Sequence, residues 1–331
     1  MKICVYGAGA IGGHIAARLA KGGASVSVVA RGPHLAAIRE HGLTVHAADG
    51  VLHSRPEASD DPAALGPQDA VFVTVKAPGL AAVAAGIAPL LRPETAVAFV
   101  MNDIPWWYHD RTPADGRRLP ELDPGEALRR AVGIPRTIGG VVYSAATVIE
   151  PGVIRIEAAD SRVILGEVDG ASTPRLQALG AALEAGGLGA PLVPDIRQAV
   201  WTKLLGNLMN GPLCLLARAD IADTLADPAV RALSLRIAEE VLALAAAEGW
   251  PLGGDTAAVR LERSARLHHR PSILQDLEAG RTMEIEALFR APLRLAAERG
   301  VAMPDLAAMV ALATSAAVAA GLYAPAPGPR A

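Results

Sequence analysis

Apolar and polar positions follow two patterns along the first 195 residues. Short, continuous apolar runs are typical of buried strands, and strands are predicted at Lys2–Tyr6, Ser25–Ala30, Ala70–Val75 and Ala96–Met101. Between them, Ala- and Leu-rich runs predict helices at Ala10–Lys21, Pro33–His41 and Ala77–Leu90. Strands that alternate with helices in this way indicate a parallel, doubly wound α/β sheet.

The later part of this half is less regular. A meander of strands is predicted at Ile138–Ile149, Val153–Glu157 and Arg162–Gly166. Pro151-Gly152 provides a turn within it, and a helix at Pro174–Glu184 with a short strand at Ala190–Val193 should close the domain. Residues 110–135 are rich in Pro, Gly and charge, which predicts an irregular excursion over the surface.

Strand signals end after Asp195. Helical runs follow one another at about 197–217, 227–248, 254–267, 271–279, 283–299 and 304–320. We therefore expect an α/β domain over residues 1–195 and an all-α domain over residues 196–323. The Pro- and Gly-rich tail, residues 324–331, is predicted to be disordered.

Composition narrows the class of protein. The chain is 51% hydrophobic and 20% charged with a net charge of −3, which favours neither a nucleic-acid partner nor a membrane surface. Cys4 and Cys214 lie in apolar stretches and are expected to be buried, reduced thiols, and no metal site is predicted. Leu306–Ala324 is uncharged but dominated by Ala, which favours a buried helix over a membrane span. A soluble, cytoplasmic protein is expected.

A glycine motif follows the first predicted strand and opens the first predicted helix. Its residues are Gly7, Ala8, Gly9, Ala10, Ile11 and Gly12. In this G-x-G-x-x-G, Gly7 permits a tight turn, Gly9 lets the backbone approach a pyrophosphate, and Gly12 lets the helix pack closely. The amides at the helix N-terminus favour phosphate charge. The motif therefore predicts a dinucleotide site in a Rossmann domain.

The end of the second strand suggests which dinucleotide binds. An NAD site usually places Asp or Glu there, against the ribose 2′-hydroxyl, but the sequence has Arg31. A guanidinium can pair with a 2′-phosphate, which predicts NADPH, unless Arg31 is only a solvated surface residue. Lys76, just beyond the third strand, is a further candidate for the same phosphate.

Three polar residues share one face of the first helix of the second domain. At 100° per residue, Asn207 and Asn210 each lie within about 40° of Lys203 on an otherwise apolar helix. They are candidates for a catalytic and substrate-binding row. The other interpretation is a solvent-facing stripe.

These motifs together resemble the ketopantoate reductase family over nearly the whole chain. The resemblance rests on the glycine loop, Arg31, Val75-Lys76-Ala77, the Lys203-x-x-x-Asn207 helix, Pro271–Asp276 and Gly280–Glu286. It implies reduction of a 2-keto acid by NADPH to the D-configured 2-hydroxy acid, in pantothenate biosynthesis. The partner implied is a small carbonyl substrate, and a homodimer is left open.

The resemblance also implies roles for single residues. Lys203 is the implied general acid, Glu284 orients substrate and lysine, Ser272 binds the substrate carboxylate, and Asn102 lies near the nicotinamide and the lysine. The chemistry suits these residue types, because hydride attack on a ketone builds an alkoxide that a lysine ammonium can protonate.

Three departures from the family pattern bear on the substrate. Asp103 stands where the family has glycine and is expected to add bulk and negative charge, and Gly211 replaces a second helix asparagine, for which Asn210 could substitute. Trp106 and Trp107 come three and four residues after Asp103. They either line the substrate pocket or only pack in an interdomain wall. A bulkier, more apolar carbonyl or imine substrate is therefore one alternative, and a non-catalytic NADP-binding sensor is another.

Overall fold

The computed structural model describes residues 1–157 and 160–325. By its internal contacts the chain divides into two compact units. The first holds residues 1–101 and 105–196, and the second holds residues 102–104 with the chain from Arg197 onward. Residues 102–104 thus group with the helices although a division at residue 195 would place them with the sheet. Most of the tail predicted to be disordered, residues 326–331, lies outside the described residues.

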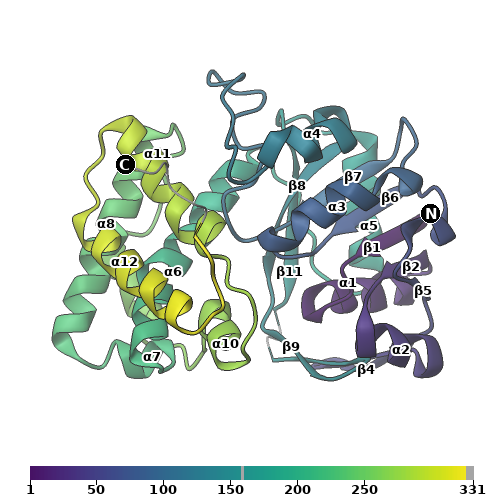
Figure 1. Cartoon of the computed structure of the whole chain (residues 1–331), viewed down its shortest axis with the longest axis horizontal. Coiled ribbons are helices and arrows are strands. Elements are labelled where there is room, and N and C mark those ends of the chain that lie inside the picture. The colour runs from purple at the N-terminus through teal and green to yellow at the C-terminus, as the bar shows by residue number, and fades with distance from the viewer. Residues whose placement is uncertain (158–159, 326–331) are drawn as a thin grey trace. The chain divides into compact units, whose positions relative to one another are not determined.

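The first unit is built on a twisted sheet whose described strands are arranged in the order β11-β8-β7-β6-β1-β2-β5 (Figure 1). Its strands are β1 (Lys2–Tyr6), β2 (Ser25–Val29), β5 (Glu57–Ser59), β6 (Ala70–Val73), β7 (Ala96–Val100), β8 (Thr137–Tyr143) and β11 (Arg162–Glu167). All neighbours pair in parallel except β11, which is antiparallel to β8. This is the strand order of a Rossmann fold with one added antiparallel strand, so the predicted fold class is confirmed.

A second sheet has the order β4-β3-β10-β9. It is formed by β3 (Leu43–Ala47), β4 (Gly50–Ser54), β9 (Ala146–Glu150) and β10 (Val153–Ile156). The predicted meander is therefore wrong, because β8 and β11 pair in the large sheet while β9 and β10 pair in this one. Strands β3 to β5 escaped prediction because they are short and partly exposed. In place of the strand expected at Ala190–Val193, the chain forms isolated bridges at Gly189 and Leu192 to β11.

Helices cover the large sheet. They are α1 (Ala10–Lys21), α2 (Gly32–His41), α3 (Leu80–Gly86), α4 (Ala127–Ala131) and α5 (Pro174–Ala185). Alternate residues of β1, Ile3 and Val5, are fully buried in one apolar cluster with Ile15 and Leu19 of α1 and Leu183 of α5. The helix predicted at Ala77–Leu90 is shorter than expected, with 3₁₀ turns on either side, since a proline occupies each turn and interrupts α-helical bonding.

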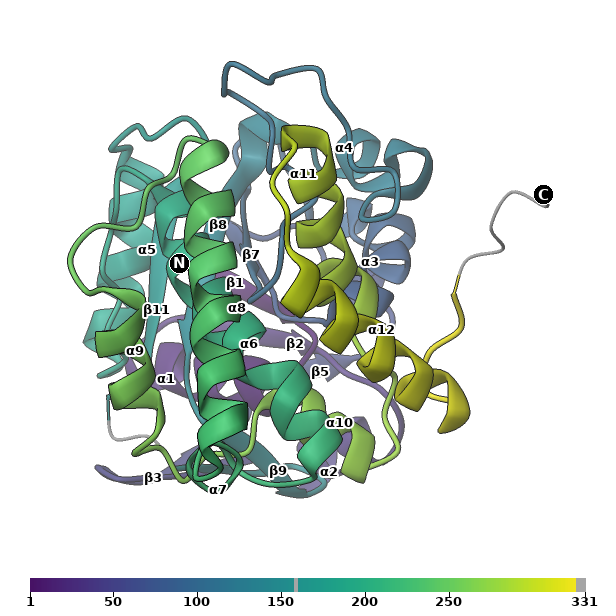
Figure 2. The same ribbon diagram turned by 90° about the vertical axis from the view of Figure 1, so that its left-hand side faces the viewer.

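The second unit is helical. Its elements are α6 (Ile196–Ala217), α7 (Ile221–Thr224), α8 (Pro228–Ala247), α9 (Ala257–Ser264), α10 (Ser272–Glu278), a π-helical turn (Glu286–Arg290), α11 (Ala291–Arg299) and α12 (Pro304–Ala319). Helix α8 contacts α9, α11 and α12 (Figure 2). Among the described residues, no helix is long and apolar enough to cross a membrane.

Candidate functional site

The glycine motif forms the turn from β1 into α1. Gly7 adopts a positive φ of 103°, a conformation that is costly for residues with a side chain. The backbone N–H groups of Gly7 and Ala8 both donate to the carbonyl oxygen of Val29, at 3.0 and 3.1 Å, which fixes the turn against the end of β2. The turn therefore lies at the carboxyl edge of the sheet, between the strands where the chain order reverses.

The other two motif glycines differ in their surroundings. A Cβ on Gly12 would lie 2.1 Å from the carbonyl oxygen of Gly7, so no side chain fits there. A Cβ on Gly9 would meet nothing within 4 Å. The loop is thus tightly packed beneath Gly12 and open at Gly9, which is the shape that a backbone cradle for a pyrophosphate requires.

Residues from the neighbouring strands surround the loop. The Thr74 hydroxyl, directly after β6, donates to the Gly7 carbonyl at 2.7 Å. The sequence analysis did not single out Thr74, because it lay within the predicted strand Ala70–Val75. Arg31 follows β2 as the N-cap residue of α2, and Lys76 follows β6; both are exposed. Arg31 and Lys76 thus lie just after β2 and β6, the two strands that pair with β1.

The polar row on α6 divides into two parts. Lys203 and Asn207 are half-buried, and the Asn207 side-chain amide donates to the carbonyl oxygen of Asn102 at 3.2 Å. Asn210 is buried, and its amide nitrogen bonds the Gly206 carbonyl and the Ser264 hydroxyl at 3.1 and 3.3 Å. The structure therefore brings Asn207 to Asn102 but engages the Asn210 nitrogen in packing against α9.

Residues 102–104 are held in the helical unit by two hydrogen bonds. At one end Asn207 binds the Asn102 carbonyl, and at the other the Ile104 N–H donates to the Ala287 carbonyl at 3.3 Å. Between them, Asp103 is only 3% exposed. Because Ala287 lies in the π-helical turn that follows Glu284, this segment, α6 and the Glu284 region belong to one arrangement.

Ser272 and Glu284 belong to the last two segments of the family resemblance, Pro271–Asp276 and Gly280–Glu286. Glu284 is half-buried between the buried residues Met283 and Ile285, and its carbonyl accepts from the Leu288 N–H at 3.1 Å. Ser272 is exposed at the first position of α10. The nearby Glu284 charge, together with burial, raises the pKa of Asp103 well above its ordinary value, burial being the larger cause.

Comparison with known proteins identifies the family. The model of the ketopantoate reductase PanE/ApbA family matches residues 3–107, and the model of its C-terminal domain matches residues 195–317. The chain belongs to the ketopantoate reductase family. It is thereby an oxidoreductase of a family that uses a nicotinamide cofactor, and the predicted resemblance is confirmed.

Individual relatives match this chain over nearly its full length. A 2-dehydropantoate 2-reductase of Mesorhizobium japonicum is 39% identical over 98% of this chain and 100% of its own. The crystal structure of a 2-dehydropantoate 2-reductase from Geobacter metallireducens has a TM-score of 0.84 at 30% identity, covering 96% of this chain and all of that one. A D-mandelate dehydrogenase solved with NADH and anilino(oxo)acetate has a TM-score of 0.82 and covers 97% of this chain and all of its own, but at 20% identity it shows the shared fold alone.

The two tryptophans that follow the family asparagine are buried in the Rossmann unit. Trp106 is 3% exposed and packs edge-on against Phe99 of β7, with ring centroids 5.6 Å apart. Trp107 is 1% exposed, and a Cβ on Gly139 of β8 would lie 2.7 Å from its ring. This burial favours the packing interpretation over an apolar face offered to a substrate.

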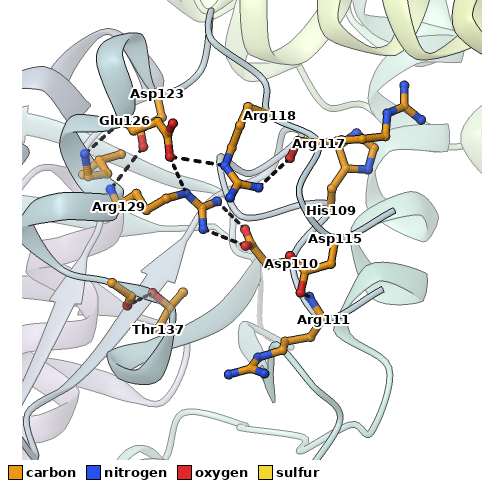
Figure 3. A network of polar contacts seen from close by, with 12 residues as sticks. His109, Asp110, Arg111, Asp115, Arg117, Arg118, Asp123, Glu126, Arg129 and Thr137 are labelled. Carbon is orange, nitrogen blue, oxygen red and sulfur yellow. Dashed lines mark hydrogen bonds and ion pairs between the residues drawn. The ribbon is translucent and has the colours of Figure 1, made fainter. Parts of the chain in front are cut away.

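A polar network joins Asp110, Arg118, Asp123, Glu126 and Arg129 (Figure 3). The Arg129 guanidinium lies 5.5 Å from the Trp106 ring and forms two bonds to the Asp110 carboxylate, at 2.6 and 2.7 Å. The Asp123 carboxylate accepts from the backbone N–H groups of Leu128 and Arg129 in α4. Residues 110–123 are irregular, as predicted, but Ala127–Ala131 forms α4, and the pair of Arg129 with the buried Asp110 links the two parts.

The same network lines a cavity of about 270 Å³ beside Trp106. Its two arginines are already paired, Arg118 with Glu126 and Arg129 with Asp110. The cavity therefore offers little uncompensated positive charge to an anionic ligand.

The environment of Asp103 bears on the negative charge expected there. Burial first, and the Glu284 charge second, raise the pKa of this carboxyl well above its ordinary value. Burial disfavours an ionised carboxylate, and Glu284 disfavours a second negative charge beside it. Gly211, the other departure, is buried, and a Cβ there would make ordinary contact with Phe289 at 3.5 Å.

Proposed function

We propose that this chain reduces a 2-keto acid, ketopantoate or a close analogue, with NADPH to the corresponding 2-hydroxy acid. The observation that carries the proposal is full-length similarity to 2-dehydropantoate 2-reductases. The resemblance noted in the sequence assigns the family roles to Lys203, Asn207 and Glu284. The half-buried places of all three in the helical unit support it.

The cofactor would be held by the first unit. The open backbone at Gly9 and the amides that begin α1 fit a pyrophosphate, and Arg31, with no acid nearby at the end of β2, fits a 2′-phosphate. When bound, the reduced nicotinamide supplies the hydride. This chain supplies binding and orientation.

The proton would come from the second unit. In the proposed mechanism the Lys203 ammonium stabilises the negative charge that builds on the carbonyl oxygen and donates its proton there. Asn207 holds Asn102 in place through the 3.2 Å bond to its carbonyl. Glu284 orients the lysine, and Ser272 binds the substrate carboxylate.

The substrate is tested with a panel of 2-keto acids. We expect the purified chain to oxidise NADPH with ketopantoate at a higher kcat/KM than with phenylpyruvate or phenylglyoxylate, because both indoles of Trp106 and Trp107 are enclosed. Preference for an aromatic keto acid would instead favour the bulkier carbonyl alternative. Tight NADPH binding without reduction of any carbonyl would favour the non-catalytic sensor.

A further inference from the structure

A histidine outside the glycine motif contacts the motif's backbone. His34, in the first turn of α2, is half-buried, and its Nε2 lies 2.6 Å from the carbonyl oxygen of Ala8. Its other ring nitrogen, Nδ1, accepts the backbone N–H of Gly152 at 3.0 Å. One imidazole therefore joins the glycine loop to a turn that lies 118 residues after His34 in the sequence.

The bonding pattern defines the state of the ring. Nδ1 faces a donor and must accept, while Nε2 faces a carbonyl and must donate. Only the neutral ring with its proton on Nε2 satisfies both partners. Any other side chain that bridges the same two groups must offer one acceptor and one donor with about the same separation as the two ring nitrogens of His34.

The far end of the bridge is itself fixed. Gly152 has a positive φ of 79° in the turn between β9 and β10, and a Cβ there would lie 3.2 Å from Ala37 of α2. Its carbonyl accepts from the Thr44 N–H of β3 at 2.9 Å. The small sheet thus presents a rigid donor to His34.

We propose that His34 is a positioning residue for the cofactor, which holds the Ala8 carbonyl so that the amides of the glycine loop stay aimed at the pyrophosphate. The role rests on the proposed nicotinamide dinucleotide site but not on the identity of the substrate. It gives the small sheet a function, because the turn at Gly152 braces the nucleotide loop through one side chain.

The role differs from that expected of Arg31, which lies at the start of the same helix. Arg31 would contact a 2′-phosphate that only NADPH carries. The loop that His34 braces faces the pyrophosphate, which NADPH and NADH share. Loss of the bridge should therefore weaken both cofactors equally, whereas loss of Arg31 should weaken NADPH alone.

The test measures the dissociation constants of NADPH and of NADH by fluorescence titration of the full chain. In His34→Phe, which keeps a ring but no bond, we expect both constants to rise about tenfold, since two ordinary hydrogen bonds are lost. In His34→Gln, whose amide offers one acceptor and one donor, we expect both to stay within about twofold of the original protein. At saturating cofactor, kcat should change little in either variant.

Two further variants serve as controls. His41→Phe changes an exposed histidine at the other end of α2 and should alter neither constant. Arg31→Ala should raise the constant for NADPH and leave that for NADH unchanged.

The outcomes separate the hypotheses. Equal losses in His34→Phe and His34→Gln would show that the ring matters for packing, and a loss confined to NADPH would show an effect through Arg31; either result overturns the proposal, as would unchanged constants in His34→Phe. A native chain that binds cofactor but reduces no keto acid would overturn the proposed function and leave this test intact.

Discussion

Two segments that follow parallel strands of the same sheet are held in place in different ways. Residues 7–12 follow β1 and residues 102–108 follow β7. The first segment is determined by backbone sterics, since Gly12 has no room for a Cβ and Gly7 needs a positive φ. The second is determined by distant partners. Asn207 and Ala287 hold its beginning, and residues of β7, β8 and α4 enclose its tryptophans.

The difference shows which requirements a sequence records locally. A glycine is a direct statement about space and dihedral angles at one position. An aromatic or acidic residue has no such fixed consequence, because its exposure and charge depend on side chains far away in the chain. Predictions for the first segment can therefore be made per residue, and those for the second need the fold.

The largest expected effect tests whether the reaction takes place near the second segment. The Asn102 carbonyl of that segment accepts a hydrogen bond from Asn207, which lies one helical turn after Lys203 on α6. Lys203→Ala should lower kcat by about 10²–10⁴, because the proposed proton donor is lost, while the NADPH dissociation constant stays unchanged. Stopped-flow turnover and fluorescence titration measure the two quantities.

The matched variant Lys203→Arg keeps the charge, but a guanidinium does not release its proton near neutral pH. It should lose most of the activity as well. Near-normal turnover in Lys203→Ala would remove this residue from the mechanism.

The next largest effect tests whether Trp107 packs in the Rossmann unit or lines the substrate pocket. Trp107→Ala should lower the free energy of unfolding by about 3–5 kcal/mol, because a fully buried indole is removed. The ratio of kcat/KM for ketopantoate to that for phenylpyruvate should not change. Chemical denaturation checks the first quantity, with the half-buried Trp250→Ala as a control of smaller loss. A stable variant with an altered ratio would restore the tryptophan to the substrate pocket.

A third comparison lies within the glycine loop. Gly12→Ala should destabilise the protein by about 1–3 kcal/mol, because its Cβ meets the Gly7 carbonyl. Gly9→Ala has open space and should leave the thermal midpoint unchanged. It should weaken NADPH binding, because the added methyl group would occupy the proposed pyrophosphate site. If both variants lost stability equally, the distinction between packed and open glycines would be wrong.

Several features were predictable because the signals were strong and local. The bounds of β1, α1 and α5 and the helical character after residue 196 follow from apolar periodicity and turn residues. The small sheet was not predictable, since β3 and β10 pair in parallel across more than 100 residues and both strands are short. Thr74 and His34 act through contacts with backbone carbonyls, and a hydroxyl or an imidazole in a sequence does not indicate which carbonyl it will reach.

The smallest expected effect concerns the pH dependence of stability at Asp103. Its pKa is raised in the folded chain by burial and by Glu284, while in the unfolded chain it takes the ordinary value near 3.9. Between these two values the folded state binds more protons, so this group's contribution to stability is present at acid pH and is lost as the pH rises. Asp103→Asn cannot titrate, so its thermal midpoint relative to that of the original protein should rise from pH 4.5 to pH 8. The exposed Asp60→Asn should show no such trend. A constant difference for Asp103→Asn across that range would mean that the carboxyl titrates normally, and the negative charge first expected at this position would then stand.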